Sequence, residues 1–426
     1  MSYLLRPLFG LLARLCILRH KPFVIGITGS FGKTTARHIV TEILKHNNSD
    51  VWTPEGNYNG EWGLPLAVLQ ARSGGKNPLL WIQAFLQWIS TIIWPKYPRI
   101  LVLEYGVDHA GEMKVQTDIV EPDVVLFTTL SPSHLEGFNT VQEYYDEKRK
   151  ILSRKKKKTY AIGNKDDIHQ VDFSCQTWYG SEGGELIFSD IHESIDKTIA
   201  SITSKNQKYP LETPILGQHH IGLITGAISV ALQMKMEMST ILQALVTIDL
   251  PNGRWNVLRW ISDSLIIDGT YNGGFDPIVA GVQMAHRLAE AHDRTLVAII
   301  GDMRELWSSE KARHEELWHE LKKLENVFYI FVWDICHTVI RPLISYEHTQ
   351  REVFFLDARE AGKCARDIIK RSTKKTLVFA KGSQNTIYLE EALKEIILPE
   401  EHVKLVRQDA MYMKKKNAFW RTLDGI

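Results

Sequence analysis

The stretch that decides the fold of this chain is Val24-Ile25-Gly26-Ile27-Thr28-Gly29-Ser30-Phe31-Gly32-Lys33-Thr34-Thr35. An apolar, strand-forming run leads into a glycine-rich loop that ends in Lys-Thr-Thr, and an amphipathic run follows over residues 36–44. A strand, a glycine loop and a helix N-terminus bind nucleotide phosphates, because backbone N–H groups and the positive end of the helix face the anion. The spacing predicts that Lys33 reaches the β- and γ-phosphates and that the Thr34 hydroxyl binds Mg²⁺.

The glycine spacing differs from that of the common phosphate loop. The pattern G-x-x-x-x-G-K-[ST] requires a glycine at position 27, which is Ile in this chain. A plain strand-to-helix turn is the alternative, but the Lys-Thr pair directly after the last glycine favours phosphate binding. The candidate nucleotide-binding residues of the loop are Gly29, Ser30, Phe31, Gly32, Lys33, Thr34 and Thr35.

Length and composition exclude several classes of protein. The 426 residues are enough for two or three domains, and their apolar and charged fractions are those of a globular protein. A formal net charge of +1 gives no reason to expect a nucleic acid partner. The four cysteines are dispersed, so neither a zinc site nor a disulfide framework is indicated. We expect a cytoplasmic protein and a monomer.

Two apolar segments raise the question of a membrane contact. Leucines recur at helical spacing over residues 1–22, with arginines between them, which predicts an amphipathic helix. The run over 79–94 has no charge and three tryptophans, yet it would span only about 24 Å as a helix. Arginines interrupt the first segment and the second is short, so neither is expected to cross a bilayer. Packing on the first domain is the favoured interpretation, and peripheral attachment to the inner face of a membrane is the alternative.

Strand and helix patterns alternate along the rest of the chain. Parallel strands are predicted over 100–104, 124–129 and 159–162, with a helix over 141–152 and a β appendage over 175–180 and 186–190. After a turn at Pro251-Asn252-Gly253 the alternation restarts, with strands over 265–268, 296–301, 327–333, 353–356 and 376–380 and a last helix over 387–397. We therefore predict an α/β protein with an N-terminal helix (1–22), a P-loop-type central domain with a mostly parallel sheet (23–250) and a Rossmann-like α/β C-terminal domain (251–426).

Polar residues follow the strands of the first predicted sheet. Glu104 ends one strand and His134 follows the next, so both are expected near Lys33 and Thr34, since ligands bind at the carboxyl ends of parallel strands. A carboxylate, an imidazole and a hydroxyl beside phosphates are suited to a divalent cation. Lys148 lies in a charged run of the predicted helix, and from the residues alone it is interpreted as a surface lysine.

The chain resembles the Mur ligase family of ATP-dependent, amide-bond-forming enzymes. The resemblance covers about residues 23–400 and keeps the order of the family's motifs. Within the family it is strongest to the members that add D-Ala-D-Ala to a UDP-N-acetylmuramoyl tripeptide in peptidoglycan synthesis. Beside the phosphate loop it is carried by Asn57-Tyr58-Asn59-Gly60, Gly63-Leu64-Pro65, Leu103-Glu104-Tyr105-Gly106, Gly111-Glu112, Ser133-His134-Leu135-Glu136, Asn164-Lys165-Asp166-Asp167, Gly253-Arg254, Asp268-Gly269-Thr270-Tyr271-Asn272, Gly301-Asp302-Met303-Arg304-Glu305-Leu306 and Lys381-Gly382-Ser383.

The resemblance implies a mechanism and its cofactors. A substrate carboxylate attacks the γ-phosphate of ATP, and the amine of D-Ala-D-Ala then displaces phosphate from the acyl phosphate. Two Mg²⁺ ions and Lys33 would screen the negative charge of the reacting groups. Thr34 and Glu104 are implied as ligands of one ion, and His134 with Lys148, which is carbamylated in the family, as ligands of the other.

The resemblance also implies further site residues. Lys33, Lys148, His134 and Arg254 are the implied catalytic residues, with Arg254 at the phosphates of ATP. The implied nucleoside contacts are Asp268, Tyr271 and Asn272, and the implied substrate contacts are Asn57, Asn59, Lys381 and Ser383.

The chain departs from the family pattern at four places. One is the stretch Asp268-Gly269-Thr270-Tyr271-Asn272-Gly273-Gly274-Phe275, where the family usually has Asp-Asp-Ser-Tyr-Asn-Ala-Asn-Pro. About two dozen residues precede the phosphate loop, where family members usually carry a domain that binds the UDP-sugar. We expect that the N-terminal helix or a partner takes its role, or that the substrate is lipid-linked. Leu223 stands where a nucleotide-binding Asn is common, and Gln384 stands where Arg usually follows Lys-Gly-Ser.

Three hypotheses for the function follow. The first is a ligase that uses ATP and Mg²⁺ to join a nucleotide-sugar peptide to D-Ala-D-Ala. The second is a ligase for another acceptor, such as a different wall peptide, a polyglutamate or a cyanophycin-like polymer. The third is a nucleotide-binding, membrane-associated protein without ligase activity, and the presence of Glu104, His134 and Lys148 together argues against it.

Overall fold

The structure is a computed structural model, and two compact units make up the chain. They comprise Met1–Ile191, Ile199–Thr213 and His220–Ile248 in the first unit, and His192–Thr198, Pro214–His219 and Asp249–Ile426 in the second. Asn57, His134 and Gln384 lie outside the described residues. These are 2–47, 49–56, 58–71, 78–94, 96–131, 137–153, 159–259, 264–304, 309–344, 351–383 and 387–423.

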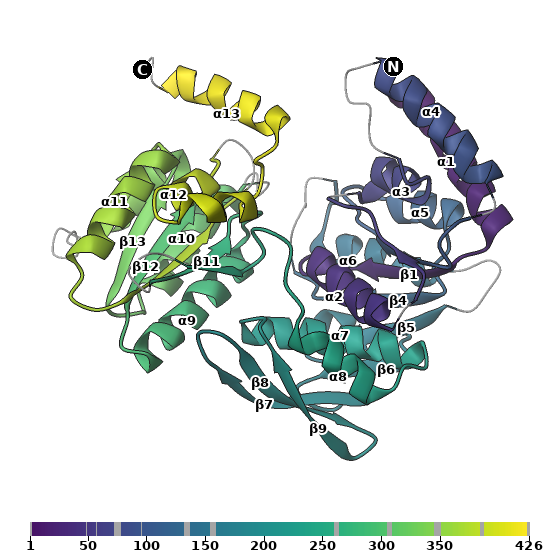
Figure 1. The fold of residues 1–426 in the computed structure, drawn as a ribbon, viewed down its shortest axis with the longest axis horizontal. Coiled ribbons are helices and arrows are strands. Elements are labelled where there is room, and N and C mark those ends of the chain that lie inside the picture. The colour runs from purple at the N-terminus through teal and green to yellow at the C-terminus, as the bar shows by residue number, and fades with distance from the viewer. Residues whose placement is uncertain are drawn as a thin grey trace. The chain divides into compact units, whose positions relative to one another are not determined.

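A nine-stranded sheet, counted over the described residues, forms the centre of the first unit (Figure 1). Its order is β2-β3-β1-β4-β5-β6-β7-β8-β9, and each pairing from β2 through β7 is parallel. The adjacent strands β3, β1 and β4 are mostly apolar and almost completely buried, as parallel strands covered on both faces must be. The strands are β1 (Phe23–Thr28), β2 (Val51–Trp52), β3 (Ile100–Glu104), β4 (Val124–Phe127), β5 (Tyr160–Asn164), β6 (Thr177–Gly180), β7 (Leu186–Glu193), β8 (Thr198–Ser204) and β9 (Gln207–Thr213).

The helices of this part of the chain bury one apolar face each against the sheet or against one another. The N-terminal helix α1 packs on α3, α4 and α5. Its side chains in the hydrophobic core are Phe9, Ala13 and Cys16. No described helix combines the length and the apolar character that a membrane crossing needs. The helices are α1 (Ser2–His20), α2 (Lys33–His46), α3 (Gly60–Val68), α4 (Pro78–Ile93), α5 (Glu112–Ile119), α6 (Val141–Arg149), α7 (Gln218–Gln233) and α8 (Met238–Val246).

The second unit contains a six-stranded sheet in the order β10-β11-β15-β12-β13-β14. Only the edge pair β10–β11 is antiparallel among the pairings of the described strands. Alternate residues of its strands point to opposite faces, so Val297 and Ile299 pack with α11 and α12 in one core. The opposite face is covered by α9, which contacts β12 and β15.

The strands of the second unit are β10 (Asn256–Arg259), β11 (Leu265–Gly269), β12 (Thr295–Gly301), β13 (Val327–Val332), β14 (Glu352–Phe355) and β15 (Thr376–Lys381). Its helices are α9 (Phe275–Ala291), α10 (Glu310–Leu321), α11 (Ala358–Arg371), α12 (Glu390–Lys394) and α13 (Ala410–Leu423). Shorter helical turns along the whole chain cover Lys150–Leu152, Ile168–Gln170, Cys336–Ile340, Arg341–Leu343 and Pro399–Lys404.

The predicted α/β class with two mostly parallel sheets is confirmed, and two predicted elements differ. The expected helix over 387–397 is shortened to α12, and the φ of +48° at Tyr388, which an α-helix cannot accommodate, excludes a start at 387. The expected β appendage is wrong as well, since β6 and β7 pair in parallel with β5 and with each other and so extend the main sheet.

Candidate active site

The phosphate loop between β1 and α2 depends on two glycines. Gly29 has a φ of +145°, and a Cβ there would lie 2.0 Å from Thr128 Oγ1. Gly32 has a φ of +82°, and a Cβ there would lie 2.8 Å from the side chain of Leu223. A larger residue is therefore excluded at both positions on steric and on conformational grounds.

The loop is anchored to β4 and α6. The Ser30 N–H donates to Thr129 O at 2.8 Å, and Thr128 Oγ1 donates to Phe31 O at 2.6 Å. The Ser30 hydroxyl lies 3.1 Å from the hydroxyl of Tyr144. Gly32 precedes α2 without a side-chain cap, so the first N–H groups of the helix are available to an anion.

Lys33 folds back over this loop. Its Nζ donates to Gly29 O at 2.7 Å and to Ser30 O at 2.9 Å, which holds the amine beside the N-terminus of α2. Burial, with a contribution from the charge of Lys148, lowers the pKa of Lys33 to about 8. Of the two threonines that follow, Thr34 is half-buried and Thr35 is buried.

Glu104 ends β3 next to the phosphate loop, because it pairs in register with Ile27 of β1. The side chain is 1% exposed, and its Oε1 has no hydrogen-bond partner among the described residues. The nearest cation is Arg37, whose Nε lies 3.3 Å from that oxygen and whose Nη2 donates to Gly56 O at 3.2 Å. A buried carboxylate oxygen without a hydrogen bond is suited to a cation ligand.

The sequence did not predict Arg37 as a residue of the site. One signal could have found it, since it lies four residues after Lys33 in the same helix and therefore on the same face.

Lys148 is buried in α6, so its interpretation as a surface lysine is wrong. Only 1% of the residue is exposed, and Nζ lies 4.5 Å from the ring centroid of Tyr144. Desolvation lowers the pKa of Lys148 to about 7, against the opposing charges of Asp108, Glu112 and Glu147. Near neutral pH a large fraction of this amine is uncharged, which makes it a nucleophile.

The first unit thus brings together Lys33, Glu104 and Lys148, since the last two contribute electrostatically to the pKa of Lys33. Asn59 lies near this group. A Cβ on Gly106 would lie 3.1 Å from the amide nitrogen of the Asn59 side chain, and Gly106 is two residues after Glu104. His134 and Asn57 belong to the predicted set but lie outside the described residues.

The second unit gathers a separate group of predicted residues at the carboxyl end of β11. The guanidinium carbon of Arg254 lies 4.2 Å from the centroid of the Tyr271 ring, in cation–π geometry. Asp268 is completely buried and accepts hydrogen bonds from the N–H and hydroxyl of Thr270 through Oδ1. Its Oδ2 has no partner among the residues described, and burial raises the pKa of Asp268 to about 6.

Lys381, at the end of the neighbouring strand β15, holds the same loop. Its Nζ donates to Asn272 O at 2.9 Å and to Gly269 O at 3.3 Å. Burial lowers the pKa of Lys381 to about 7, with a contribution from Arg254. Ser383 donates to Gly273 O at 3.3 Å and accepts from the Arg304 N–H at 3.0 Å. The structure therefore places Lys381 and Ser383 against the loop that carries Tyr271 and Asn272.

An ion-pair network supports this loop from behind. Arg407 donates to Thr270 O at 2.8 Å and to Tyr271 O at 3.1 Å, and its Nη2 lies 2.6 Å from Glu390 Oε2. Lys416 of α13 is completely buried between Glu390 at 2.7 Å and Glu391 at 2.6 Å. These residues escaped the sequence analysis, because nothing in a lone Arg or Lys indicates a buried partner far along the chain.

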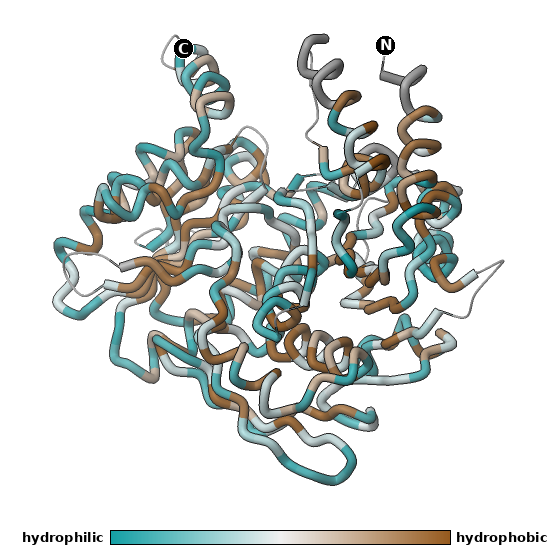
Figure 2. Tube along the Cα trace, turned by 45° about the vertical axis from the view of Figure 1, so that its right-hand side comes forward, coloured by the Kyte–Doolittle hydropathy of each residue, from teal (hydrophilic) through white to brown (hydrophobic). Residues whose placement is uncertain are grey.

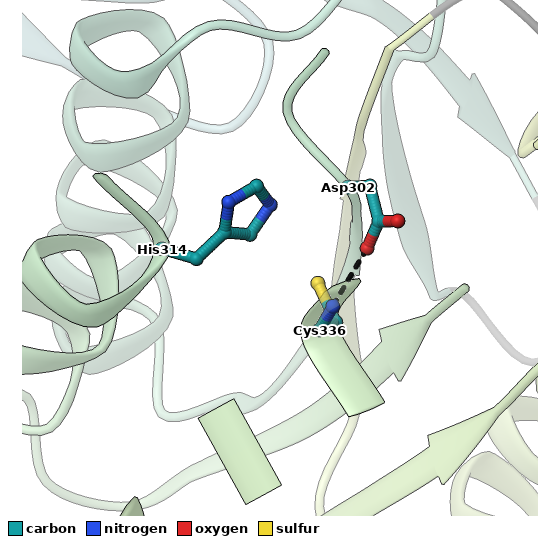
Figure 3. A group of neighbouring side chains, drawn as sticks. All are labelled: Asp302, His314 and Cys336. Carbon is teal, nitrogen blue, oxygen red and sulfur yellow. Dashed lines mark hydrogen bonds between the residues drawn. The ribbon is translucent and has the colours of Figure 1, made fainter. Parts of the chain in front are cut away.

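Asp302, His314 and Cys336 form a buried cluster in the second unit, with one potential ligand atom of each within 4.8 Å of the others (Figure 3). Asp302 accepts the N–H groups of Ile335 at 3.0 Å and of Cys336 at 2.8 Å, which caps the turn after β13. His314 Nε2 accepts the Met303 N–H at 3.0 Å, and Nδ1 donates to Glu310 O at 2.7 Å. Since both ring nitrogens have backbone partners, the cluster does not fit a metal site.

Comparison with known proteins identifies relatives of this chain. Residues 27–231 match the family model of the Mur ligase middle domain. The chain is 25% identical over 390 residues to a UDP-N-acetylmuramoyl-tripeptide–D-alanyl-D-alanine ligase from Haemophilus influenzae, a match that covers 89% of this chain and 78% of the relative. Four further bacterial ligases with that name also match, and the chain spans 59–62% of the length of each.

Solved structures share the fold. MurF from Acinetobacter baumannii superposes with a TM-score of 0.76 at 21% identity, over 92% of this chain and 80% of that one. MurF ligase from Thermotoga maritima in complex with ADP superposes with a TM-score of 0.73 at 24% identity, over 92% of this chain and 83% of that one. A Mur ligase middle domain thus occupies residues 27–231, and over most of its length the chain is similar to ATP-dependent amide ligases of that family and shares their fold.

Proposed function

We propose that this protein uses ATP to join D-Ala-D-Ala to UDP-N-acetylmuramoyl-tripeptide through an acyl phosphate, in peptidoglycan synthesis. A carboxylate oxygen of the tripeptide attacks the γ-phosphorus, and the bond to ADP breaks. The amine of D-Ala-D-Ala then attacks the acyl carbon, phosphate leaves, and the amine loses a proton. The names of the relatives that cover most of the chain support this choice of substrates. A cytoplasmic location is part of the proposal.

The observation that carries the proposal is the burial of Lys148 beside Lys33. A binding protein for nucleotides needs one amine at the phosphates, whereas this unit buries a second amine with a pKa of about 7. An uncharged lysine can add CO₂ to form a carbamate with release of a proton, which converts a buried neutral amine into an anion. We propose that Lys148 carries this carbamate, since an anionic ligand suits Mg²⁺ and an ammonium group does not.

The other residues of the first unit fit Mg²⁺ and a phosphate chain. Glu104 offers a buried oxygen to which no described residue donates a hydrogen bond, and Thr34 offers a hydroxyl at the start of α2. Bound Mg²⁺ would neutralise phosphate charge, so that a carboxylate can approach a polyanion. Lys33 and the N–H groups of the loop bind and orient the phosphates, and His134 completes the proposed ligand set.

In the second unit we propose that Tyr271, Asn272 and Asp268 contact the nucleoside and that Arg254 contacts phosphate. The cation–π pair supports these assignments, and so does the buried oxygen of Asp268 that has no hydrogen-bond partner among the described residues. Lys381 and Ser383, proposed as substrate contacts, also hold the Tyr271 loop through its carbonyl groups. Asn57 and Asn59 are proposed to contact the muramoyl peptide.

The test is phosphate release from ATP and Mg²⁺ with UDP-N-acetylmuramoyl-tripeptide, in the presence and absence of D-Ala-D-Ala. We expect release only with both substrates, and the pentapeptide product by mass spectrometry. The variant Lys33→Ala should abolish release while its unfolding temperature stays near that of the wild type. The exposed variant Lys45→Ala, on the same helix, is the matched control.

Two negative outcomes separate the parts of the proposal. Binding of ATP without turnover would reject these substrates, and glutamate and lipid-linked acceptors would then be assayed in the same way. Failure to bind ATP at all would reject the assignment of the phosphate loop itself.

A further inference from the structure

The N-terminal helix α1 exposes a leucine face. Leu8, Leu11, Leu15 and Leu18 lie within one side of the helix at 3.6-residue periodicity, and Leu11 and Leu18 are 55% and 59% exposed. The opposite side, with Phe9 at its centre, is already buried in the core. The helix is therefore apolar on two sides, and packing on the first unit covers only one of them.

The neighbouring helix α4 exposes a second apolar face. Leu86 is 62% exposed and Ile93 is 64% exposed, and Phe85 and Ile89 lie on the same side. Trp94, directly after the helix, is 64% exposed. Figure 2 shows apolar stretches along both helices.

Helices α1 and α4 pack on each other, so their exposed apolar faces lie on neighbouring elements of the first unit. The ring centroids of Phe9 and Trp88 lie 4.5 Å apart in edge-to-face geometry. Arg19 Nη2 lies 3.3 Å from Ile93 O, and His20 Nε2 lies 3.0 Å from Thr91 O. We call the exposed side chains of α1 and α4 the apolar helix pair; they are Leu8, Leu11, Leu15, Leu18, Phe85, Leu86, Ile89, Ile93 and Trp94.

The two segments of sequence that carry the apolar helix pair contain charges of one sign only. Residues 1–41 and 62–103, which contain both helices, include no Asp or Glu. Exposed cations flank the apolar side chains, namely Arg14, Arg19, Lys21, Lys96 and Arg99. An apolar helix face edged by Arg and Lys, with a Trp at its end, matches the layers of a bilayer surface, where acyl chains lie beneath anionic headgroups.

We propose that the apolar helix pair docks this protein on the surface of an anionic lipid bilayer. The boundary between headgroups and acyl chains takes up the exposed leucines of α1 together with Leu86, Ile89 and Ile93 of α4. The cations pair with lipid phosphates. Trp94 lies at headgroup depth, because its ring is apolar and its N–H is a donor. A second copy of this chain is a poorer occupant, since a self-complementary contact would bring these same-sign charges together.

The test is co-sedimentation of the full chain with vesicles of phosphatidylcholine alone or with about one third phosphatidylglycerol. We expect partitioning into the anionic vesicles that weakens when salt is raised. The double variant Leu11→Asp/Leu15→Asp should lower the partition coefficient about tenfold or more. The variant Arg14→Gln should lower it about fivefold, since it removes one cation and leaves the apolar face intact.

The matched control is Val403→Asp/Met411→Asp, which places two carboxylates on exposed apolar residues of the second unit and should leave partitioning unchanged. Circular dichroism of each variant excludes loss of folding. Absence of wild-type binding to anionic vesicles would overturn the proposal. So would equal binding by the wild type and the leucine variant. A dimer that the leucine variant abolishes, without vesicle binding, would identify a second copy as the occupant instead.

Discussion

The guanidinium of Arg37 lies with Nε 3.3 Å from Oε1 of Glu104, and the two side chains are 6% and 1% exposed. The contact joins the first turns of α2 to the end of β3, so it lies directly beneath the phosphate loop. The geometry places the charges near each other, and no described residue donates a hydrogen bond to that oxygen. Glu104 is therefore compensated electrostatically, and we propose that the same carboxylate also binds Mg²⁺.

The variant Arg37→Met should lower the free energy of unfolding by about 3 kcal/mol, because it leaves a buried carboxylate without its cation. The double variant Arg37→Met/Glu104→Leu should recover most of that loss, since both charges are then gone. Urea unfolding monitored by fluorescence measures the free energy of unfolding of the single and the double variant. Lys45→Met, which breaks the exposed pair with Glu42, is the control and should change stability by less than about 0.5 kcal/mol. Equal losses for Arg37→Met and the control would show that the buried pair is energetically unimportant.

The variant Lys148→Ala should lower turnover about a hundredfold or more, because the proposed anionic ligand is lost beside the reacting phosphate. Added acetate or propionate should restore part of the activity by occupying the space with a free carboxylate. Phosphate release measures both effects, and Lys114→Ala, an exposed lysine of α5, should behave as the wild type with or without the acids. Full activity of Lys148→Ala would reject the carbamate.

The stability of the protein should rise with pH above neutrality. Burial lowers the pKa of Lys148 and Lys381 to about 7, whereas each returns to 10.5 on unfolding. Between these values the unfolded chain binds more protons than the folded one, so the free energy of unfolding increases with pH. Each lysine contributes up to about 1.4 kcal/mol per pH unit in this window, and nothing further above it.

The measurement is urea unfolding at several pH values from 7 to 9, for the wild type and for Lys148→Met. The variant should show a shallower rise, by about 1 kcal/mol per pH unit, and Lys45→Met should keep the slope of the wild type. Parallel curves for Lys148→Met and the wild type would mean that Lys148 stays protonated in the folded protein.

The variant Arg407→Met should raise the KM for ATP about fivefold, with a smaller change in kcat, since it frees the carbonyl groups of Thr270 and Tyr271 and lets the proposed nucleoside loop move. It should also lower the free energy of unfolding by about 3 kcal/mol, because Glu390 loses a buried partner. Steady-state kinetics and urea unfolding test the two effects. Lys404→Met, in an exposed pair with Glu401, is the control. A loss of stability with unchanged KM would limit Arg407 to a structural role.

The sequence predicted most elements and part of the candidate site. The apolar runs over 100–104 and 296–301 are strands because parallel strands covered on both faces are apolar throughout, a signal that needs no knowledge of their neighbours. The turn at Gly29 and Gly32 was equally readable, since only glycine tolerates those φ values at those contacts. The start of the 387–397 helix was not, because a left-handed φ at a residue such as Tyr388 has no signal in the local sequence.

By itself, then, the sequence determined the alternation of strands and helices, the glycine loop and the order of the polar residues that follow the strands, because periodicity and backbone stereochemistry act locally. Tertiary structure alone decided that Lys148 is buried and that Arg37 faces Glu104. It also decided that Arg407 and Lys416 form ion pairs with a buried carboxylate of α12. Burial and charge compensation depend on which segments meet in space. The same lysine has a pKa of 10.5 in water and about 7 among packed neighbours, and no local pattern distinguishes the two.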